Sequence, residues 1–190
     1  MANEFTFNYR QDPLNPVDFN HCLKQHQDRV FSFCAHLLSD KAEAADTTQD
    51  VFIKLWEQNI PMDPERVLGW LLTVARNKCI DVIRKRKVRK SVTESDEFSL
   101  DSLSSGEILP DRMASDALFQ TKLSRALQTL GEPHKSILVL REIQDYKYEE
   151  ICDVLSLPLN TVKVYLHRAR KMLRLELGRK MMEAGEHDFV

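Results

Sequence analysis

The sequence predicts an all-α protein made of two small helical domains, the first with three helices and the second with four. Helix-breaking residues are scarce, with five glycines and seven prolines in 190 residues, which disfavours a turn-rich sandwich or barrel. Apolar residues recur every three to four positions over most of the chain, the period of an α-helix. An acidic, serine-rich stretch at residues 91–116 interrupts that period, so we expect a flexible linker there.

The first domain is expected over residues 19–90, after a mobile lead-in at residues 1–18. Its first helix, from about residue 17 to 38, is predicted by an apolar stripe: Phe19, Leu23, Val30, Cys34 and Leu37. Asp40 followed by Glu43 resembles a capping box and predicts the start of a second helix, which Pro61 closes. An acid at the N-cap and proline at the first helical position, Asp63 and Pro64, open a third helix that continues to about residue 90.

The second domain is expected over residues 117–178, followed by a frayed tail at residues 179–190. Gly131 ends its first helix and Pro133 opens the next. A short helix from Tyr148 to Leu155 follows, and then a four-residue turn at residues 156–159. Asn160 is predicted to cap a last helix, which runs over residues 161–177 and stops at Gly178. The linker before this domain carries seven acidic residues and one basic residue.

Composition excludes several classes of protein. No apolar run approaches the ~20 residues of a membrane span, and residues 1–10 contain no signal peptide, so we expect a cytoplasmic protein without membrane insertion. The glycines are too isolated for a phosphate-binding loop, and no H-E-x-x-H or G-x-S-x-G motif is present, which argues against an enzyme or a cofactor. Four cysteines are expected to be thiols: Cys22, Cys34, Cys79 and Cys152.

A zinc site is the alternative for some of these cysteines. Cys22 and His26 are four residues apart, a helical spacing that can present two zinc ligands on one face. However, Cys34 belongs to the apolar stripe, and Cys34 and His36 point to different sides of a helix. Buried free thiols are therefore the simpler interpretation, and no metal is predicted.

A strongly basic segment ends the third helix. Six of the seven residues 84–90 are basic, and residues 61–90 hold nine bases against three acids. This charge on one helix attracts phosphates, although bases also suit the carboxyl end of any solvated helix. Upstream, Trp70 can stack on an unpaired base and Asn77 can hydrogen-bond its edge; Trp70 alone would equally suit a core.

The end of the second domain has the pattern of a helix-turn-helix. A short helix, a tight turn with Pro158 and a polar-capped helix form the unit that places a helix in the major groove. Residues 160–174 carry five bases and no acid, and the exposed face of this helix combines them with other polar residues: Thr161, Lys163, Tyr165, His167, Arg168, Arg170, Lys171 and Arg174. The alternative is an ordinary helical hairpin, which does not need an exposed face of one charge sign.

The second helix of the first domain has an exposed face of mixed character. Together with Phe52 and Trp56, this face mixes apolar and acidic groups: Asp46, Gln49, Asp50, Ile53, Lys54 and Glu57. Such a face suits the docking of a partner helix, because apolar contacts are ringed by polar groups. A solvated face of a helical bundle is the alternative.

These motifs resemble the extracytoplasmic-function (ECF) group of bacterial RNA polymerase sigma factors. Asp46-Thr-Thr-Gln-Asp-Val-Phe52 with Trp56 is similar to that family's D-x-x-Q-[ED]-x-F-x-x-x-W segment, and Trp70-Leu-Leu-Thr-Val-Ala-Arg-Asn77 to its W-L-x-x-[IV]-A-R-N segment. Asn160-Thr-Val-Lys163 and Leu166-His-Arg-Ala-Arg170 are similar to its helix-turn-helix. At the position of a common Ser-Arg pair stands Val164-Tyr165, and tyrosine lacks the fork by which arginine reads guanine.

The resemblance implies a factor that binds core RNA polymerase and promoter DNA. The clamp coiled coil of the largest subunit would contact Asp46, Gln49, Asp50, Ile53 and Trp56, and the flap of the second-largest subunit is a second implied polymerase contact. The −10 element would contact Trp70, Thr73, Arg76, Asn77, Arg84, Lys85, Arg86, Lys87 and Arg89. The −35 element would contact Asn160, Thr161, Lys163, Val164, Tyr165, His167, Arg168 and Lys171.

The resemblance also implies an anti-sigma partner, commonly a membrane-linked one. Two other classes stay open from the residues alone. A conventional dimeric helix-turn-helix regulator would bind a palindrome and would not need the segment from Asp46 to Trp56. The other open class is a metal-dependent redox sensor or enzyme built around the thiols.

Overall fold

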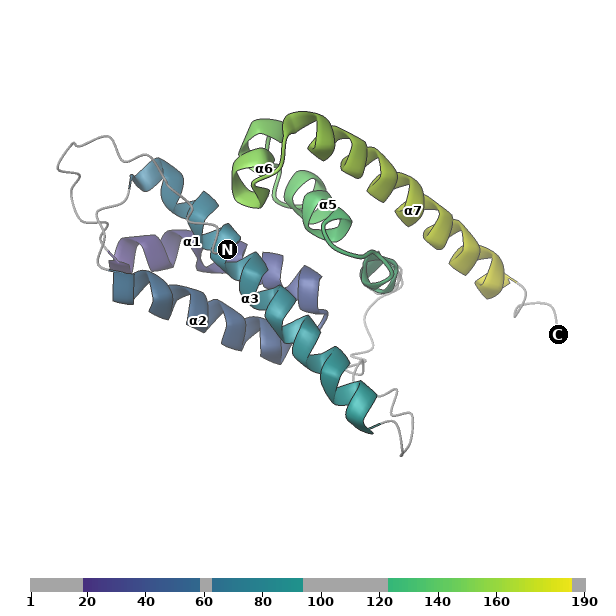
Figure 1. Cartoon of the computed structure of the whole chain (residues 1–190), viewed down its shortest axis with the longest axis horizontal. Helices are drawn as coiled ribbons and strands as arrows, with labels where there is room; N and C mark the ends of the chain where they lie inside the picture. The colour runs from purple at the N-terminus through teal and green to yellow at the C-terminus, as the bar shows by residue number, and fades with distance from the viewer. Residues whose placement is uncertain (1–18, 59–62, 94–122, 186–190) are drawn as a thin grey trace, which may run out of the picture.

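The computed structural model describes residues 19–58, 63–93 and 123–185, and the regular elements within these ranges are all helices (Figure 1). The all-α prediction is therefore confirmed. The expected lead-in at residues 1–18 and nearly all of the acidic segment lie outside the described residues. None of the described helices is both long enough and apolar enough to cross a membrane.

Three helices form the first unit: α1 (Phe19–Leu38), α2 (Lys41–Gln58) and α3 (Pro64–Thr93), each in contact with the other two. Their shared core contains fully buried side chains, among them Phe33, Leu37 and Leu71. The predicted starts of α2 and α3 are confirmed by their caps. The carboxylate of Asp40 accepts a hydrogen bond from the Glu43 amide at 2.9 Å, and that of Asp63 accepts one from the Glu65 amide at 3.0 Å.

The second unit contains a helical stretch at residues 123–128 and the helices α5 (His134–Glu142), α6 (Tyr148–Leu155) and α7 (Leu159–Gly185). Helices α5, α6 and α7 contact one another around buried apolar side chains. The bounds of α6 match the prediction. The first stretch ends before Gly131, contrary to expectation, because the Thr129 and Leu130 amides bond to carbonyls three residues back and tighten its last turn.

Both ends of α7 differ from the prediction. The Val162 amide bonds to the Pro158 carbonyl at 3.0 Å, so the helix begins two residues early and Asn160 lies exposed in its first turn instead of capping it. At the other end the helix passes through Gly178 and continues to Gly185, where a frayed tail was expected. An ion pair of 2.8 Å between Arg179 and Glu176, one turn apart, supports this extension.

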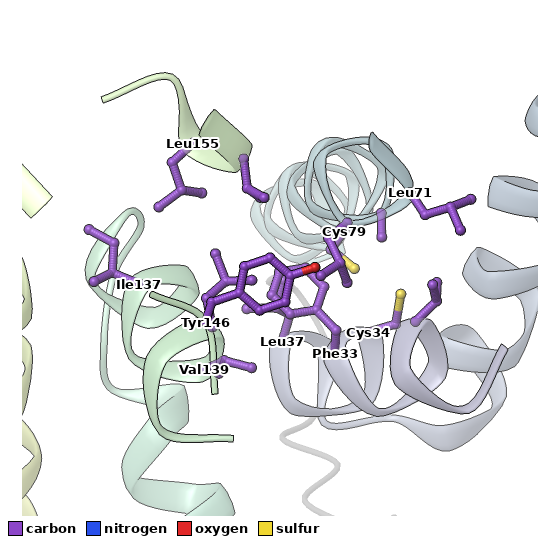
Figure 2. Close-up of a cluster of buried hydrophobic side chains, with 14 of the residues drawn as sticks. Phe33, Cys34, Leu37, Leu71, Cys79, Ile137, Val139, Tyr146 and Leu155 are labelled. Atoms are coloured by element: carbon purple, nitrogen blue, oxygen red, sulfur yellow. The ribbon is translucent and has the colours of Figure 1, made fainter. Parts of the chain in front are cut away.

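The two units pack against each other, with α3 on α6 and α1 on α5. Their buried side chains form one continuous cluster. In Figure 2, Tyr146 and Val139 of the second unit face Leu37, Phe33 and Cys79 of the first. Because α1 and α3 supply one wall of this cluster, the packing brings the second unit against the face of α3 on which several candidate site residues lie.

Candidate nucleic-acid and polymerase interfaces

The predicted docking face of α2 lies on the surface of the molecule. All five of its candidate residues are exposed: Asp46, Gln49, Asp50, Ile53 and Trp56. The two apolar members stand out, because Ile53 is 53% exposed and Trp56 is 68% exposed. The ring of Phe19 meets the Trp56 ring edge-on, with centroids 5.1 Å apart, and so supports its orientation.

A single ion pair among the described residues connects this face with α3. The Lys78 ammonium lies 2.8 Å from the Asp50 carboxylate, whose side chain is 59% exposed. Solvent screening leaves little stabilisation in such a pair. The face therefore offers apolar anchors, Ile53 and Trp56, within a ring of carboxylate and amide groups, an arrangement found at protein–protein interfaces.

The candidate residues in the middle of α3 have two different surroundings. Asn77 is exposed and Trp70 is half-buried against the core. The Thr73 hydroxyl lies 2.9 Å from the Gly69 carbonyl and 3.2 Å from the Val154 carbonyl of α6, so α6 covers it. The Arg76 Nε lies 3.6 Å from the Glu132 carboxylate, also in the second unit.

The basic end of α3 is mostly exposed. Arg84, Lys85, Lys87 and Arg89 lie at the surface, and Arg84 has an ion pair of 3.7 Å with Asp81. Clustered ammonium and guanidinium groups on one helix end produce a positive potential that attracts a phosphate backbone. The predicted electrostatic surface is thus present, and its contact with DNA stays a prediction.

Arg86 differs from its basic neighbours because its guanidinium is held by other elements of the first unit. Its Nε donates to the Glu43 carboxylate at 3.0 Å, and its Nη1 donates to the Leu38 carbonyl at 3.0 Å. Its Nη2 also contacts the same carboxylate. Arg86 therefore braces α3 against the start of α2 and the end of α1.

The predicted reading face of α7 is accessible along its length. Its more exposed members are Asn160, Lys163, Val164, His167, Arg168 and Lys171, and its half-buried members are Thr161 and Tyr165. On the opposite side, Val162, Leu166 and Ala169 are buried against the unit. Arg170 is held away from this face by an ion pair of 2.6 Å with Glu142 of α5.

Two local features fix the orientation of this face. Ser156 adopts a left-handed backbone conformation, with φ 52°, and ends α6 so that the chain turns directly into α7. The Tyr165 ring packs on the His134 ring of α5, with centroids 4.9 Å apart. Tyr165 is thus held in a supported position on the half-buried side of the reading face.

The cysteines are free thiols, as expected, and three of the four are buried. Burial raises the pKa of Cys22 to about 11, so this group stays protonated at neutral pH. Cys34 and Cys79 are both fully buried in the core of the first unit. Within the described ranges, no group of three potential ligands could hold a metal ion.

Sequence reasoning missed the polar residues between the two units. Lys135 is 3% exposed, and its ammonium donates to the Leu37 carbonyl at 2.6 Å and to Gln128 Oε1 at 2.7 Å. Burial lowers the pKa of Lys135 to about 8. Arg29 donates to the Gln144 carbonyl at 2.7 Å. No local pattern could reveal the contacts between units, because the partners lie 98 and 115 residues apart in the sequence.

Comparisons with known proteins match both units. The family model described as Sigma-70 region 2 matches residues 22–89, and that described as Sigma-70, region 4 matches residues 120–173. The chain therefore belongs to the sigma-70 family. Members of this family give RNA polymerase its promoter specificity, so the protein acts in transcription initiation.

Relatives of known name place the chain in a particular group of this family. It is 28% identical to the ECF RNA polymerase sigma factor SigE of Mycolicibacterium smegmatis over 95% of this chain and 69% of that protein. It is 29% identical to the ECF RNA polymerase sigma factor SigW of Bacillus subtilis over 80% of this chain and 84% of that protein. The protein is thus an ECF-type sigma factor, and these relatives are sigma factors, not enzymes.

Solved structures agree on the fold. The sigma factor RpoE from Bartonella quintana, in complex with the anti-sigma factor NepR, superimposes with a TM-score of 0.67 at 21% identity, covering 85% of this chain and 97% of that one. CnrH, in complex with the cytosolic domain of CnrY, gives a TM-score of 0.63 at 20% identity, covering 85% of this chain and 88% of that one.

Proposed function

We propose that the exposed α2 face binds core RNA polymerase, that α3 contacts the −10 element and that α7 enters the major groove of the −35 element. The observation that carries this assignment is the separation of three chemically distinct exposed faces on three helices. An apolar and acidic face suits a protein partner, whereas the basic end of α3 and the basic face of α7 suit DNA. We further propose that the protein performs no catalysis itself and acts in the cytoplasm beside RNA polymerase.

The partner surfaces follow from the resemblance of the motifs. The clamp coiled coil of the largest polymerase subunit would meet the α2 face at Ile53 and Trp56, and the flap of the second-largest subunit would meet the second unit. Both exposed apolar side chains are too large to remain solvated without cost, which supports a protein contact there.

Within α7, base readout and phosphate contact are assigned to different residues. Lys163, Tyr165 and Arg168 lie within the first three turns of α7, the part of a recognition helix that meets base edges, and we assign readout to them. Lys171 and Arg174 lie one to two turns further on and are assigned to phosphates. In α3, the exposed Asn77 is assigned to a base near −10.

An anti-sigma factor is a further proposed partner. RpoE and CnrH were solved as complexes, the first with an anti-sigma factor and the second with the cytosolic domain of CnrY. The same fold and the ECF-type motifs support such a partner for this chain. Co-purification from cells that express a tagged chain, followed by mass spectrometry, tests it.

Run-off transcription with purified core polymerase and fragmented genomic DNA tests the central proposal. Discrete new transcripts are expected, and alignment of their start sites would reveal both promoter elements. Trp56→Ala should weaken core binding about tenfold or more, since a central aromatic anchor is lost. Lys41→Ala, an exposed change at the start of the same helix and outside this face, is the control. Equal effects of both variants would contradict the assigned face.

The α7 assignment is tested on the promoters found in this way. Arg168→Ala should cost about 1–3 kcal/mol of binding and relax the −35 preference, as expected for a base contact. Arg125→Ala removes the same charge elsewhere on the second unit and should leave the preference intact. Equal loss on all sequences would reassign Arg168 to phosphate contact, and DNA binding without core binding would favour a conventional helix-turn-helix regulator.

A further inference from the structure

The second unit occupies part of the α3 face that is assigned to the −10 element. Thr73 is covered by the Val154 carbonyl of α6, and Arg76 is paired with Glu132. An added Cβ on Gly69, one turn before Thr73, would lie 4.0 Å from the Val154 side chain, so α6 sits in van der Waals contact with α3 along this turn. The second unit therefore restricts access to both positions, through α6 at Thr73 and through Glu132 at Arg76.

Glu132 presents to Arg76 the same kind of group that DNA would present. A carboxylate, like a phosphate, offers anionic oxygens to the guanidinium fork. Only 20% of the Arg76 side chain and 23% of the Glu132 side chain are exposed, so the pair is largely closed to solvent. Ser136 holds the carboxylate in place, donating to Oε2 at 2.6 Å.

The pairing is nevertheless incomplete. Among the described residues, Arg76 Nε and Glu132 Oε1 are buried atoms without a hydrogen-bond partner, and Nε stays 3.6 Å from the nearer carboxylate oxygen. Unsatisfied buried polar atoms cost free energy, so this contact is a poor match by the standards of a stable core. A phosphate that approached Arg76 in an open form could bond the guanidinium through two oxygens.

Contacts beside this pair define the closed arrangement. Lys135 reaches across to the Leu37 carbonyl at the end of α1, and Gln144 bonds with Arg29 through both its side chain and its backbone. The hydroxyls of Ser39 and Ser124 lie 3.3 Å apart across the boundary. The closed form is thus held by specific polar contacts as well as by the shared apolar cluster.

We propose that Glu132 is an internal competitor for the −10 DNA, an anionic stand-in that holds Arg76 while α6 covers Thr73. The inference rests on the proposed function, because it takes the α3 face as the −10 contact. Promoter binding by this face then requires the two units to separate, and the closed form lowers the apparent affinity in proportion to its population.

The test measures binding of the full chain to a fluorescein-labelled single-stranded DNA of mixed sequence by fluorescence anisotropy. Glu132→Gln keeps an acceptor for Ser136 but removes the charge that holds Arg76. It should tighten binding about threefold to tenfold, the gain available when a closed population of about 90% opens. Glu149→Gln, an exposed change on α6, has the same effect on net charge and should change the affinity much less.

Measuring the same binding for Arg76→Ala, alone and combined with Glu132→Gln, distinguishes a failure of the proposed competition from a failure of the α3 contact. If Arg76→Ala weakens binding and Glu132→Gln has no further effect in that background, the competition is supported. If Arg76→Ala weakens binding but Glu132→Gln alone does not tighten it beyond Glu149→Gln, the competition is wrong and the α3 contact stands. If Arg76→Ala leaves the affinity unchanged, the assignment of Arg76 to the −10 contact is wrong, and the competition falls with it.

A reversible covalent lock gives a second, independent readout. The double variant Ser39→Cys with Ser124→Cys places two thiols where the hydroxyls are 3.3 Å apart, close enough for a disulfide after small adjustment. Its oxidised form should bind the single-stranded probe at least about threefold more weakly than its reduced form, with no such difference for either single variant. Equal affinity of the oxidised and reduced double variant would overturn the proposal.

Discussion

Adjacent cations at the basic end of α3 have different roles, although they form one uninterrupted run in the sequence. Lys85 is exposed, whereas Arg86 is fixed by the Glu43 carboxylate and the Leu38 carbonyl. The exposure of Lys85 follows from composition, because a run of bases must lie mostly at the surface. The brace formed by Arg86 could not be predicted, since Glu43 lies 43 residues away in the sequence.

Substitution of these neighbours should separate stability from DNA binding. Arg86→Ala removes charge-assisted hydrogen bonds from a half-buried site and should lower the free energy of unfolding by about 1–2 kcal/mol. Lys85→Ala should leave stability within about 0.5 kcal/mol and weaken binding to DNA at low salt. Urea unfolding and anisotropy measure the two effects, and equal stability of both variants would contradict the brace.

At the scale of elements, local signals set the helix starts in the first unit and all of α6. Asp40 and Asp63 cap their helices as predicted because each short carboxylate satisfies an amide next to it in sequence. The ends of α7 were predicted wrongly. Pro158 supplies the first carbonyl, so Asn160 is not needed as a cap, and Gly178 does not stop the helix because neighbouring residues continue the hydrogen-bonded ladder.

The helical state of Gly178 has a measurable consequence. It lies inside α7, and an added Cβ there would meet no atom within 4 Å. Gly178→Ala should therefore stabilise the helix by up to about 1 kcal/mol, through the higher helix propensity of alanine. Circular dichroism and thermal unfolding should show more helix and a higher Tm. Gly131→Ala, outside the helices, is the control. An equal rise in helix content and Tm in both variants would contradict the extension of α7.

At the scale of the whole molecule, the contact between the two units is what sequence could not reveal. The linker composition predicted two units, and both family models match, but nothing in the order of residues showed that they pack together. Lys135 illustrates the reason. It lies in the first turn of α5, soon after a proline, where a lysine is usually solvated. Here its ammonium is enclosed by the end of α1 from the other unit and by Gln128 of its own.

The buried lysine makes the closed arrangement pH-dependent. The pKa of Lys135 falls from 10.5 to about 8, chiefly through burial. The closed form therefore binds this proton less tightly than an open form, so closure becomes more favourable as the pH rises from about 8 towards 10.5. Small-angle scattering should show a smaller radius of gyration at a pH of about 9.5 than at about 7. If the radius of gyration of the Lys135→Met variant still changes with pH in the same way, Lys135 is not the cause.

The placement of the two tryptophans makes them intrinsic fluorescent probes of two different surfaces. The chain contains only two, and Trp56 stands in solvent on α2 while Trp70 lies half-buried on α3, one turn before Thr73. A partner that docks on α2 should shift the emission of the first towards the blue. Bases that stack on α3 should quench the second. Trp70→Phe leaves Trp56 as the single tryptophan and would report docking on α2, whereas Trp56→Phe leaves Trp70 and would report strand capture on α3.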